Sequence, residues 1–489
     1  MSEEILINVS PRETRVGIVE NGVLQEILVE RASKRGLVGN IYMGTVVRVL
    51  PGMQAAFVDM GLERAAFLHI SDMLSVNEEY LQLSDVTESH ETITDLLKDG
   101  QKIAVQVIKD PIGSKGARLT TRISLPSRYL VFMPEFSHIG ISQRIEDETE
   151  RERLKKIVEQ AFQGEGGYII RTAAESANAQ EIIANQSYLM KMWEAIQRAQ
   201  QQAKSGDIIH EDLPLYLRAL RDYISTQTER VLIDDSTTFE RSLSFIQDFI
   251  PTITGKVELY SGERPLFDLY GIEDEIQKAL QRKVQLKSGG HLVFDQTEAM
   301  TTIDVNTGAF VGHRNLEETI FKTNLEAAVT IARQLRVRNL GGIIILDFID
   351  MTNDEHKRQV LRALEKALAR DHTKNSISEV SALGLVEMTR KRTRESLEHV
   401  LCETCSLCAG RGTIKTTETV CHEIFREVLR AARAYDIKGY LVLAAQEVVD
   451  RMLDEESTSV AQLEMQIGKS IKFQVESLYT QEQFDVVLM

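Results

Sequence analysis

The sequence predicts a multidomain α/β protein, and three features lead to this prediction. The chain has 489 residues, more than one compact core usually contains, which suggests about three domains. Short strands separated by glycine fill residues 37–125, and strands alternate with long helices from about residue 280 onward. The composition, 43% hydrophobic and 27% charged, is typical of a globular protein.

Neither the amino terminus nor the longest apolar run points to a membrane. The first residues, MSEEILINVSPRE, are acidic and lack an apolar signal core, and the apolar run GGIIILDFIDM is shorter than the roughly 20 residues that span a bilayer. We therefore expect a cytoplasmic protein whose four cysteines are reduced, which favours a metal-binding role over disulfides. The net charge of −16 argues against broad coating of nucleic acid but leaves a local basic channel open.

The amino-terminal third is expected to consist mainly of strands. Three alternating strands are expected within residues 1–35, in EILINVS, ETRVGIVENG and VLQEILVER, with ENG as the turn between the last two. About five short strands follow between residues 37 and 125. So many strands in so short a segment predict a small closed barrel of the OB type, a fold that binds oligonucleotides.

Two aromatic residues of this barrel are candidates for RNA contact. Alternation puts Phe57 and Phe67 on the less apolar faces of their strands, where rings can stack on bases. The alternative is that both belong to the core, as aromatic residues in small barrels usually do. Lys115, in the glycine-flanked turn PIGSKGAR, is a candidate phosphate contact.

The rest of the chain predicts helices and then an α/β domain. Residues 126–214 contain two amphipathic helices, DETERERLKKIVEQAF and QSYLMKMWEAIQRAQQQAKSG, separated by the strand GGYIIRT. After a mixed region, strands ending in TTIDVNTG lead to the helix LEETIFKTNLEAAVTIARQLRVRN, the strand IIILDFID and a helix from about residue 353. This order predicts a partly parallel sheet. A helix and a small α+β tail follow the cysteines.

Two acids in this domain are candidate metal ligands. In TTIDVNTG, alternation places Asp304 and Asn306 on one face and the apolar residues on the other. Asp347 interrupts an apolar strand of the kind that is covered on both faces. Carboxylates at the carboxyl ends of neighbouring strands suit Mg²⁺, which can activate water against a phosphodiester. The alternative is that these acids cap turns or accept backbone N–H groups; we expect Asp350 to cap or to support Asp347.

The cysteine cluster HVLCETCSLCAGRGT predicts a zinc knuckle. Cys405 and Cys408 form a C-x-x-C pair before a glycine turn, which supplies half of a tetrahedral zinc site. Two completions remain open from the residues alone: His399 and Cys402 of the same chain, or a second knuckle from another subunit. Cys421 is expected to be a buried helix residue.

A basic run, MTRKRTRES, precedes the cysteines. Runs of charge usually form the solvated face of a helix. A second interpretation is that Arg390, Lys391, Arg392 and Arg394 follow the nucleic-acid backbone near the acids.

The segments DQTEAMTTIDVNTG, NLGGIIILDFIDM, GLVEMTRKRTRES and CAGRGT, with the preceding barrel, resemble the ribonuclease E/G family over essentially the whole chain. The family consists of Mg²⁺-dependent endoribonucleases that cut single-stranded RNA and leave 5′-phosphate and 3′-hydroxyl ends. The resemblance implies seven segments: a first RNase H-like segment (1–36), an S1 barrel of the OB type (37–125), a 5′-sensor region (126–214), a second RNase H-like segment (215–279), a DNase I-like catalytic domain (280–401), a zinc link (402–415) and a small α+β C-terminal domain (416–489).

The resemblance also implies roles for individual residues. Asp304 and Asp347 would hold Mg²⁺, and Asn306 would orient water or the scissile phosphate. Phe57 and Phe67 would grip RNA in the S1 barrel.

Further roles concern the RNA end and the subunit contact. Arg171 and Thr172 would form a sensor for a 5′-monophosphate, together with Lys374, where the family has an arginine; a lysine offers a point charge without a bidentate fork. Cys405 and Cys408 would share one Zn²⁺ with a second subunit, while the extra Cys402 leaves the ligand choice open.

The function that the resemblance implies is maturation of the 5′ end of 16S ribosomal RNA and turnover of messenger RNA. The expected partners are single-stranded RNA, both ribosomal precursor and messenger, and a second copy of the chain, with a tetramer left open. Two alternatives remain: a non-catalytic S1-type RNA-binding protein, and a nuclease that acts on DNA.

Overall fold

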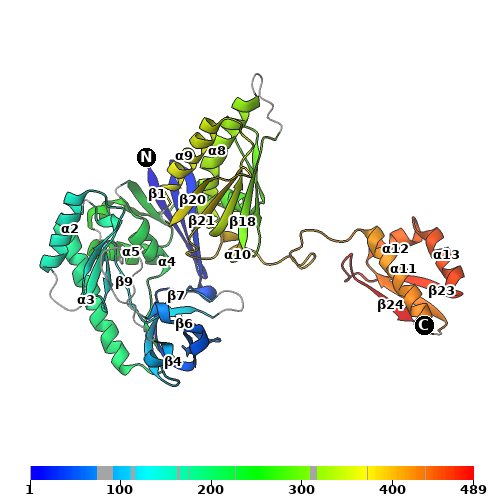
Figure 1. Ribbon diagram of the computed structural model, residues 1–489, viewed down its shortest axis with the longest axis horizontal. Coiled ribbons are helices and arrows are strands. Elements are labelled where there is room, and N and C mark those ends of the chain that lie inside the picture. The colour runs from blue at the N-terminus through cyan, green and yellow to red at the C-terminus, as the bar shows by residue number, and fades with distance from the viewer. Residues whose placement is uncertain are drawn as a thin grey trace. The chain divides into compact units, whose positions relative to one another are not determined.

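The computed structural model describes residues 2–73, 92–111, 116–161, 166–175, 177–225, 227–249, 251–308, 316–371, 373–435 and 437–489. The chain divides into two compact units, Met1–Val400 and Leu401–Met489 (Figure 1). Lys115 lies outside the described residues, so its proposed contact with RNA stays a prediction. Among the described residues, no helix combines the length and the apolar character that crossing a bilayer requires.

The first unit begins with a mixed five-stranded sheet of order β15-β14-β1-β2-β3. Its strands are β1 (Glu3–Ser10), β2 (Glu13–Glu20), β3 (Val23–Arg31), β14 (Thr228–Ile233) and β15 (Val257–Leu259). β1 to β3 confirm the three expected strands, and Asn21 and Gly22 take the positive φ angles, 50° and 75°, that a two-residue hairpin turn requires. The helices α4 (Leu215–Tyr223) and α5 (Ser236–Phe249) pack on one face. On the other face, Gly17 meets side chains of α6 (Leu266–Leu269) and α7 (Ile272–Leu280).

A five-stranded barrel is inserted between β3 and β14. It consists of β4 (Ile41–Leu50), β5 (Ala55–Asp59), β6 (Ala66–His69), β7 (Lys102–Lys109) and β8 (Arg118–Thr120), with the short helix α1 (Ile93–Leu96). Pairing of β4 with β7 closes the barrel, and β13 (Ile208–His210) extends it beside β4. Val58 and Leu68 are fully buried inside. The predicted small closed barrel is confirmed.

A four-stranded sheet with two helices follows the barrel. The strands, in the order β11-β12-β10-β9, are β9 (Leu125–Pro126), β10 (Leu130–Met133), β11 (Ile139–Ile141) and β12 (Gly167–Ile170). The two expected helices are α2 (Glu148–Ala161) and α3 (Ala179–Gln202), and both pack on one apolar core. α3 begins at Ala179 rather than at the expected Gln186, because Asn178 and Glu181 form a capping box at its start.

The predicted α/β region forms a six-stranded sheet of order β16-β17-β18-β19-β21-β20. The strands are β16 (Lys283–Gln285), β17 (His291–Gln296), β18 (Met300–Asn306), β19 (Gly342–Asp347), β20 (Asn375–Val380) and β21 (Leu385–Arg390), and only β18 and β19 pair in parallel. The helices α8 (Leu316–Val337) and α9 (Asp354–Leu368) cover one face (Figure 1). The expectation that β19 is covered on both faces is wrong, since Ile343 is 47% exposed on the open face.

The second unit is a small α+β fold, as expected. A three-stranded sheet of order β23-β22-β24 contains β22 (Gly439–Ala444), β23 (Ser470–Val475) and β24 (Phe484–Leu488). The helices α11 (Thr417–Ala434), α12 (Gln446–Leu453) and α13 (Ser457–Ile467) pack on it. The short helix α10 (Leu397–Leu401) spans the boundary between the two units. Cys421 is fully buried in α11, and burial raises the pKa of its thiol to about 11.

Candidate functional site

The two candidate metal-binding acids lie side by side on the open face of the six-stranded sheet. β18 and β19 run in parallel, and Asp304 is the direct partner of Asp347 in their register. Along β18, Ile303 and Val305 are buried against α8 and α9, whereas Asp304 is exposed. The alternation read from the sequence therefore places the acids as anticipated, at the carboxyl ends of adjacent strands, where α/β sheets usually bind ligands.

No described basic side chain balances the charges of these two acids. Within the described part of the chain, no Lys, Arg or His lies within ion-pair distance of Asp304 or Asp347. Asn306 donates a hydrogen bond from Nδ2 to Oδ2 of Asp304 over 2.8 Å. Partial burial and the nearby charges of Asp304 and Asp350 raise the pKa of Asp347 above its ordinary value. Among the described residues, the charged neighbours that shift the pKa of Asp347 are therefore both acidic.

The donor set fits a hard divalent cation. Two carboxylates offer only oxygen ligands, and Mg²⁺ is commonly held by one or two carboxylates while water and phosphate complete its coordination. The described residues contain no cluster of three or more His, Cys, Asp or Glu side chains of the kind that would enclose a metal fully. Two carboxylates alone leave most coordination positions of such an ion to water or to the oxygens of a ligand.

The segment after Asp347 is held by a residue that the sequence did not single out. Asn324, fully buried in α8, donates from Nδ2 to the carbonyl oxygen of Ile349 over 2.8 Å and accepts from the Ile349 N–H through Oδ1 over 3.2 Å. This two-way bond fixes the backbone two residues beyond Asp347. A cavity of about 280 Å³ lies next to this segment, lined in part by Asp350 and Leu383. An asparagine inside an amphipathic helix gives no local sign of such a contact.

The barrel presents an aromatic surface to solvent. Phe57 and Phe67 are partners across β5 and β6, with ring centroids 6.1 Å apart. Phe57 is 37% exposed, so the core interpretation of this residue does not hold. His69, two residues after Phe67 on the same face, stacks on Phe67 with 6.4 Å between centroids. The period of two in β6 could have identified His69, because alternate residues share one face.

Arg171 and Thr172 follow β12, and each already has a partner. Nη1 of Arg171 lies 2.7 Å from the carbonyl oxygen of Ser127 and 2.8 Å from Oδ1 of Asp222 in α4. The Thr172 hydroxyl is 2.9 Å from the Ser142 hydroxyl. Both side chains remain partly exposed. No local pattern could have identified Asp222, because it lies far along the chain and belongs to a different element.

Lys374 directly precedes β20, whereas Arg171 follows β12 of another sheet, and Lys374 lies close in sequence to a buried ion pair. The guanidinium of Arg390 bonds both carboxylate oxygens of Asp371, at 2.6 and 3.1 Å, and also reaches the Thr373 hydroxyl at 3.2 Å. Burial alone would raise the pKa of Asp371, but Arg390 outweighs it and the pKa is lowered. Lys374 thus directly follows Thr373, whose hydroxyl is bonded by Arg390.

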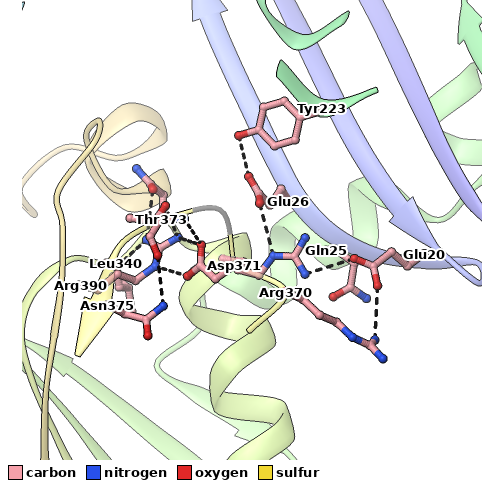
Figure 2. A network of polar contacts seen from close by, with 12 residues as sticks. Glu20, Gln25, Glu26, Tyr223, Leu340, Arg370, Asp371, Thr373, Asn375 and Arg390 are labelled. Atoms are coloured by element: carbon pink, nitrogen blue, oxygen red, sulfur yellow. Dashed lines mark hydrogen bonds and ion pairs between the residues drawn. The ribbon is translucent and has the colours of Figure 1, made fainter. Parts of the chain in front are cut away.

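This ion pair belongs to a network that joins the six-stranded and five-stranded sheets. Figure 2 shows Glu20 of the five-stranded sheet directed toward Arg370, and Glu26 of the same sheet directed toward the Tyr223 hydroxyl. Arg336 of α8 bonds Glu26 at 3.3 Å and Glu20 at 3.2 Å, and the Tyr223 hydroxyl donates to Glu26 over 2.9 Å. Because Arg336 and Glu26 are buried, these contacts fix α8, which covers the six-stranded sheet, against the five-stranded sheet.

The basic run at residues 390–394 is not a solvated helix face. Arg390 ends β21 with its side chain 3% exposed in the pair with Asp371, and Arg394 bonds Glu26 at 3.3 Å. Arg392 donates to the carbonyl oxygen of Gly341. Arg390 is therefore unavailable to a ligand, and the interpretation of the run as a nucleic-acid contact is wrong for this residue, whereas Lys391, Arg392 and Arg394 are exposed.

The three spaced cysteines all lie in the second unit. Cys402 and Cys405 are exposed, and Cys408 is partly buried. Backbone N–H groups of Gly412 and Gly410 and a contact with Cys405 lower the pKa of Cys408, as suits a thiolate ligand. Cys402 does not join Cys405 and Cys408 in a three-ligand cluster among the described residues. His399, the other candidate ligand, belongs to the first unit and lies 3.5 Å from Glu395.

Comparison with known proteins identifies relatives over the whole chain. Residues 124–393 match the Ribonuclease E/G family, and residues 37–119 match the S1 RNA binding domain. The chain is 55% identical to ribonuclease G of Escherichia coli (strain K12) over 489 residues, which are 100% of both chains. It is 52% identical to ribonuclease G of Haemophilus influenzae over 487 residues, 99% of each chain. Ribonuclease E of Escherichia coli (strain K12) is 37% identical over 466 residues, 94% of this chain and 44% of that relative.

Proposed function

Because the chain belongs to the ribonuclease E/G family, we propose that it is a Mg²⁺-dependent enzyme that cuts single-stranded RNA internally and leaves 5′-phosphate and 3′-hydroxyl ends. Family membership makes the chain an endoribonuclease, and its S1 domain supports binding of single-stranded RNA. The alternative of a non-catalytic S1-type RNA-binding protein is therefore excluded. The observation that carries the Mg²⁺ proposal is the paired register of two carboxylates, Asp304 and Asp347, without a cationic partner among the described residues.

The proposed catalytic residues would hold the metal ion, and their neighbours would orient these residues. Asp304 and Asp347 would bind Mg²⁺ from neighbouring strands, and a bound ion of this kind polarises a phosphodiester and activates water. The Asn306 amide keeps Asp304 oriented through its 2.8 Å hydrogen bond. Asn324 holds the backbone beyond Asp347. We further propose that this sheet, within residues 280–401, is a DNase I-like catalytic domain and that residues 1–36 and 215–279 together are RNase H-like.

RNA capture is assigned to the barrel and to the region that follows it. Phe57 and Phe67 would stack on bases of a single strand, for about 1–3 kcal/mol per base, and Lys115 would contact a phosphate. Arg171, Thr172 and Lys374 would recognise a 5′-monophosphate. The proposed substrates are the precursor of 16S ribosomal RNA, at its 5′ end, and messenger RNA.

We also propose that two chains share one Zn²⁺. Cys405 and Cys408 of each chain would supply two thiolates, which together make a tetrahedral site. The lowered pKa of Cys408 supports this role. The enzyme would then be a cytoplasmic homodimer, with Cys402 outside the metal site.

The test uses the full chain and one short single-stranded RNA with Mg²⁺ or with a chelator. We expect internal cuts only with Mg²⁺, none with Asp304→Asn or Asp347→Asn, and product ends that a 5′-phosphate-dependent exonuclease accepts. Asp295→Asn is the matched control, because Asp295 lies on the same face of the sheet but pairs with Arg282; it should cleave normally. Full cleavage by Asp304→Asn would refute the metal role of that acid. A DNA oligomer of the same sequence that is cut equally well would favour a DNA nuclease.

A further inference from the structure

The guanidinium of Arg171 is already occupied on one side by an acid of the chain itself. Nη1 bonds the Ser127 carbonyl oxygen and lies 2.8 Å from Oδ1 of Asp222. Nε and Nη2 of Arg171 have no hydrogen bond to any described residue. The free edge of the guanidinium can therefore donate to two oxygens of a phosphate, but that phosphate would share Arg171 with Asp222.

Asp222 is held in place by a second arginine. Arg221 bonds both of its oxygens, Nη2 to Oδ2 at 2.9 Å and Nε to Oδ1 at 3.2 Å. The side chain of Arg221 is 9% exposed and also lies 3.5 Å from Asp212. Burial alone would raise the pKa of Asp222, but the charges of Arg221 and Arg171 outweigh it, so the pKa is lowered and the acid is ionised at neutral pH. The carboxylate thus has little freedom to move away from Arg171.

The charges of this cluster cancel. Arg171 and Arg221 carry two positive charges, and Asp212 and Asp222 carry two negative ones. A terminal phosphate that approaches Arg171 therefore also meets the fixed carboxylate of Asp222 beside the guanidinium. Like charges at such separations repel by amounts that remain significant near a protein surface, so the cluster binds a phosphate less tightly than Arg171 alone would.

We propose that Asp222 is a specificity-determining residue that weakens recognition of the 5′-phosphate by sharing Arg171 with it. The inference rests on the proposed 5′-sensor. Asp222 would limit how strongly the chain prefers RNA with a 5′-monophosphate over RNA with a 5′-hydroxyl. Asp222 also has a structural interpretation, in which it only orients the guanidinium. The two roles predict opposite effects when the charge is removed, which makes them separable.

The experiment compares the full-length wild type and Asp222→Asn on two RNAs of one sequence, with a 5′-monophosphate or a 5′-hydroxyl. The readout is the ratio of kcat/KM for the two RNAs. We expect Asp222→Asn to raise this ratio about two- to fivefold, the range for one partly exposed charge pair, through a lower KM on the phosphorylated RNA and no change on the hydroxyl RNA. Asp222→Glu, which keeps the charge, should retain the wild-type ratio.

The matched control is Glu211→Gln, which removes one negative charge from an ion pair with Arg35 and should leave the ratio unchanged. If Asp222→Asn has a lower melting temperature than the wild type, Asp222→Ser serves as the second neutral variant. A ratio that falls or stays the same in the neutral variants overturns the proposal. A wild-type ratio of one refutes the 5′-sensor itself, whereas the proposed cleavage reaction would still stand.

Discussion

Replacing Asp347 with asparagine should stabilise the chain in the absence of divalent cations and remove its stabilisation by Mg²⁺. Adjacent strands lie about 4.8 Å apart, and Asp304 and Asp347 are direct partners across them. Two unit charges at about 5 Å repel by about 1–3 kcal/mol when the effective dielectric constant lies between that of water and that of a protein surface. The raised pKa of Asp347 has the same origin in part. Asp347→Asn removes this repulsion and also one of two metal ligands.

The assay is thermal unfolding of the full chain in chelator and in excess Mg²⁺. In chelator, Asp347→Asn should melt above the wild type. Mg²⁺ at a hundredfold excess over its Kd should stabilise the wild type by about 2.7 kcal/mol and the variant hardly at all. Asp295→Asn, which breaks a pair with Arg282 on the same face, should lower stability slightly and keep the Mg²⁺ response. If Asp347→Asn melts below the wild type in chelator, the fold stabilises the ionised carboxylate of Asp347 without a metal ion, which contradicts the proposed metal site.

Three further predictions concern other parts of the molecule. Asp371→Asn leaves Arg390 buried without its counter-charge, so we expect a loss of about 3–5 kcal/mol in denaturant unfolding. Because the pKa of Asp371 is lowered in the folded state, its contribution to the free energy of unfolding is present above pH 3.8 and is lost as the pH falls through that lower pKa. An Asp371→Asn variant whose stability falls at acid pH as steeply as that of the wild type would contradict this. Phe67→Ala should weaken binding of single-stranded RNA, measured by fluorescence anisotropy, by about 1–3 kcal/mol, and unchanged affinity would exclude stacking. Cys405→Ser should abolish bound zinc and the dimer in sedimentation experiments, whereas Cys402→Ser should keep both; loss in the two variants alike would place Cys402 among the ligands.

The parts of the fold that follow local patterns were predictable. Alternation along β18 places Asp304 and Asn306 on one face and Ile303 and Val305 on the other. The apolar face packs on α8 and α9. The Asn-Gly turn between β2 and β3 follows from the backbone angles that those residues tolerate. The same local reasoning failed for β19, whose apolar run suggested cover on both faces, while Ile343 lies on an open face.

Contacts between distant segments could not be read from the sequence. Nothing near Arg171 indicates that Asp222 of α4 will share its guanidinium. The pairing of Arg390 with Asp371 likewise depends on how β21 meets the end of α9, so the basic run looked like a surface feature. Tertiary packing decides which groups a buried charge pairs with. Such contacts leave no periodic pattern in the sequence from which they could be predicted.

Equilibrium binding of Mn²⁺, as a spectroscopic substitute for Mg²⁺, shows whether Asp304 and Asp347 together hold a metal ion. Electron paramagnetic resonance of the free ion would count the sites on the full-length wild type, Asp304→Asn and Asp347→Asn. We predict that each substitution removes one Mn²⁺ site per chain that Mg²⁺ competes for. Equal numbers of sites with equal affinity in all three proteins would contradict a metal ion held between positions 304 and 347.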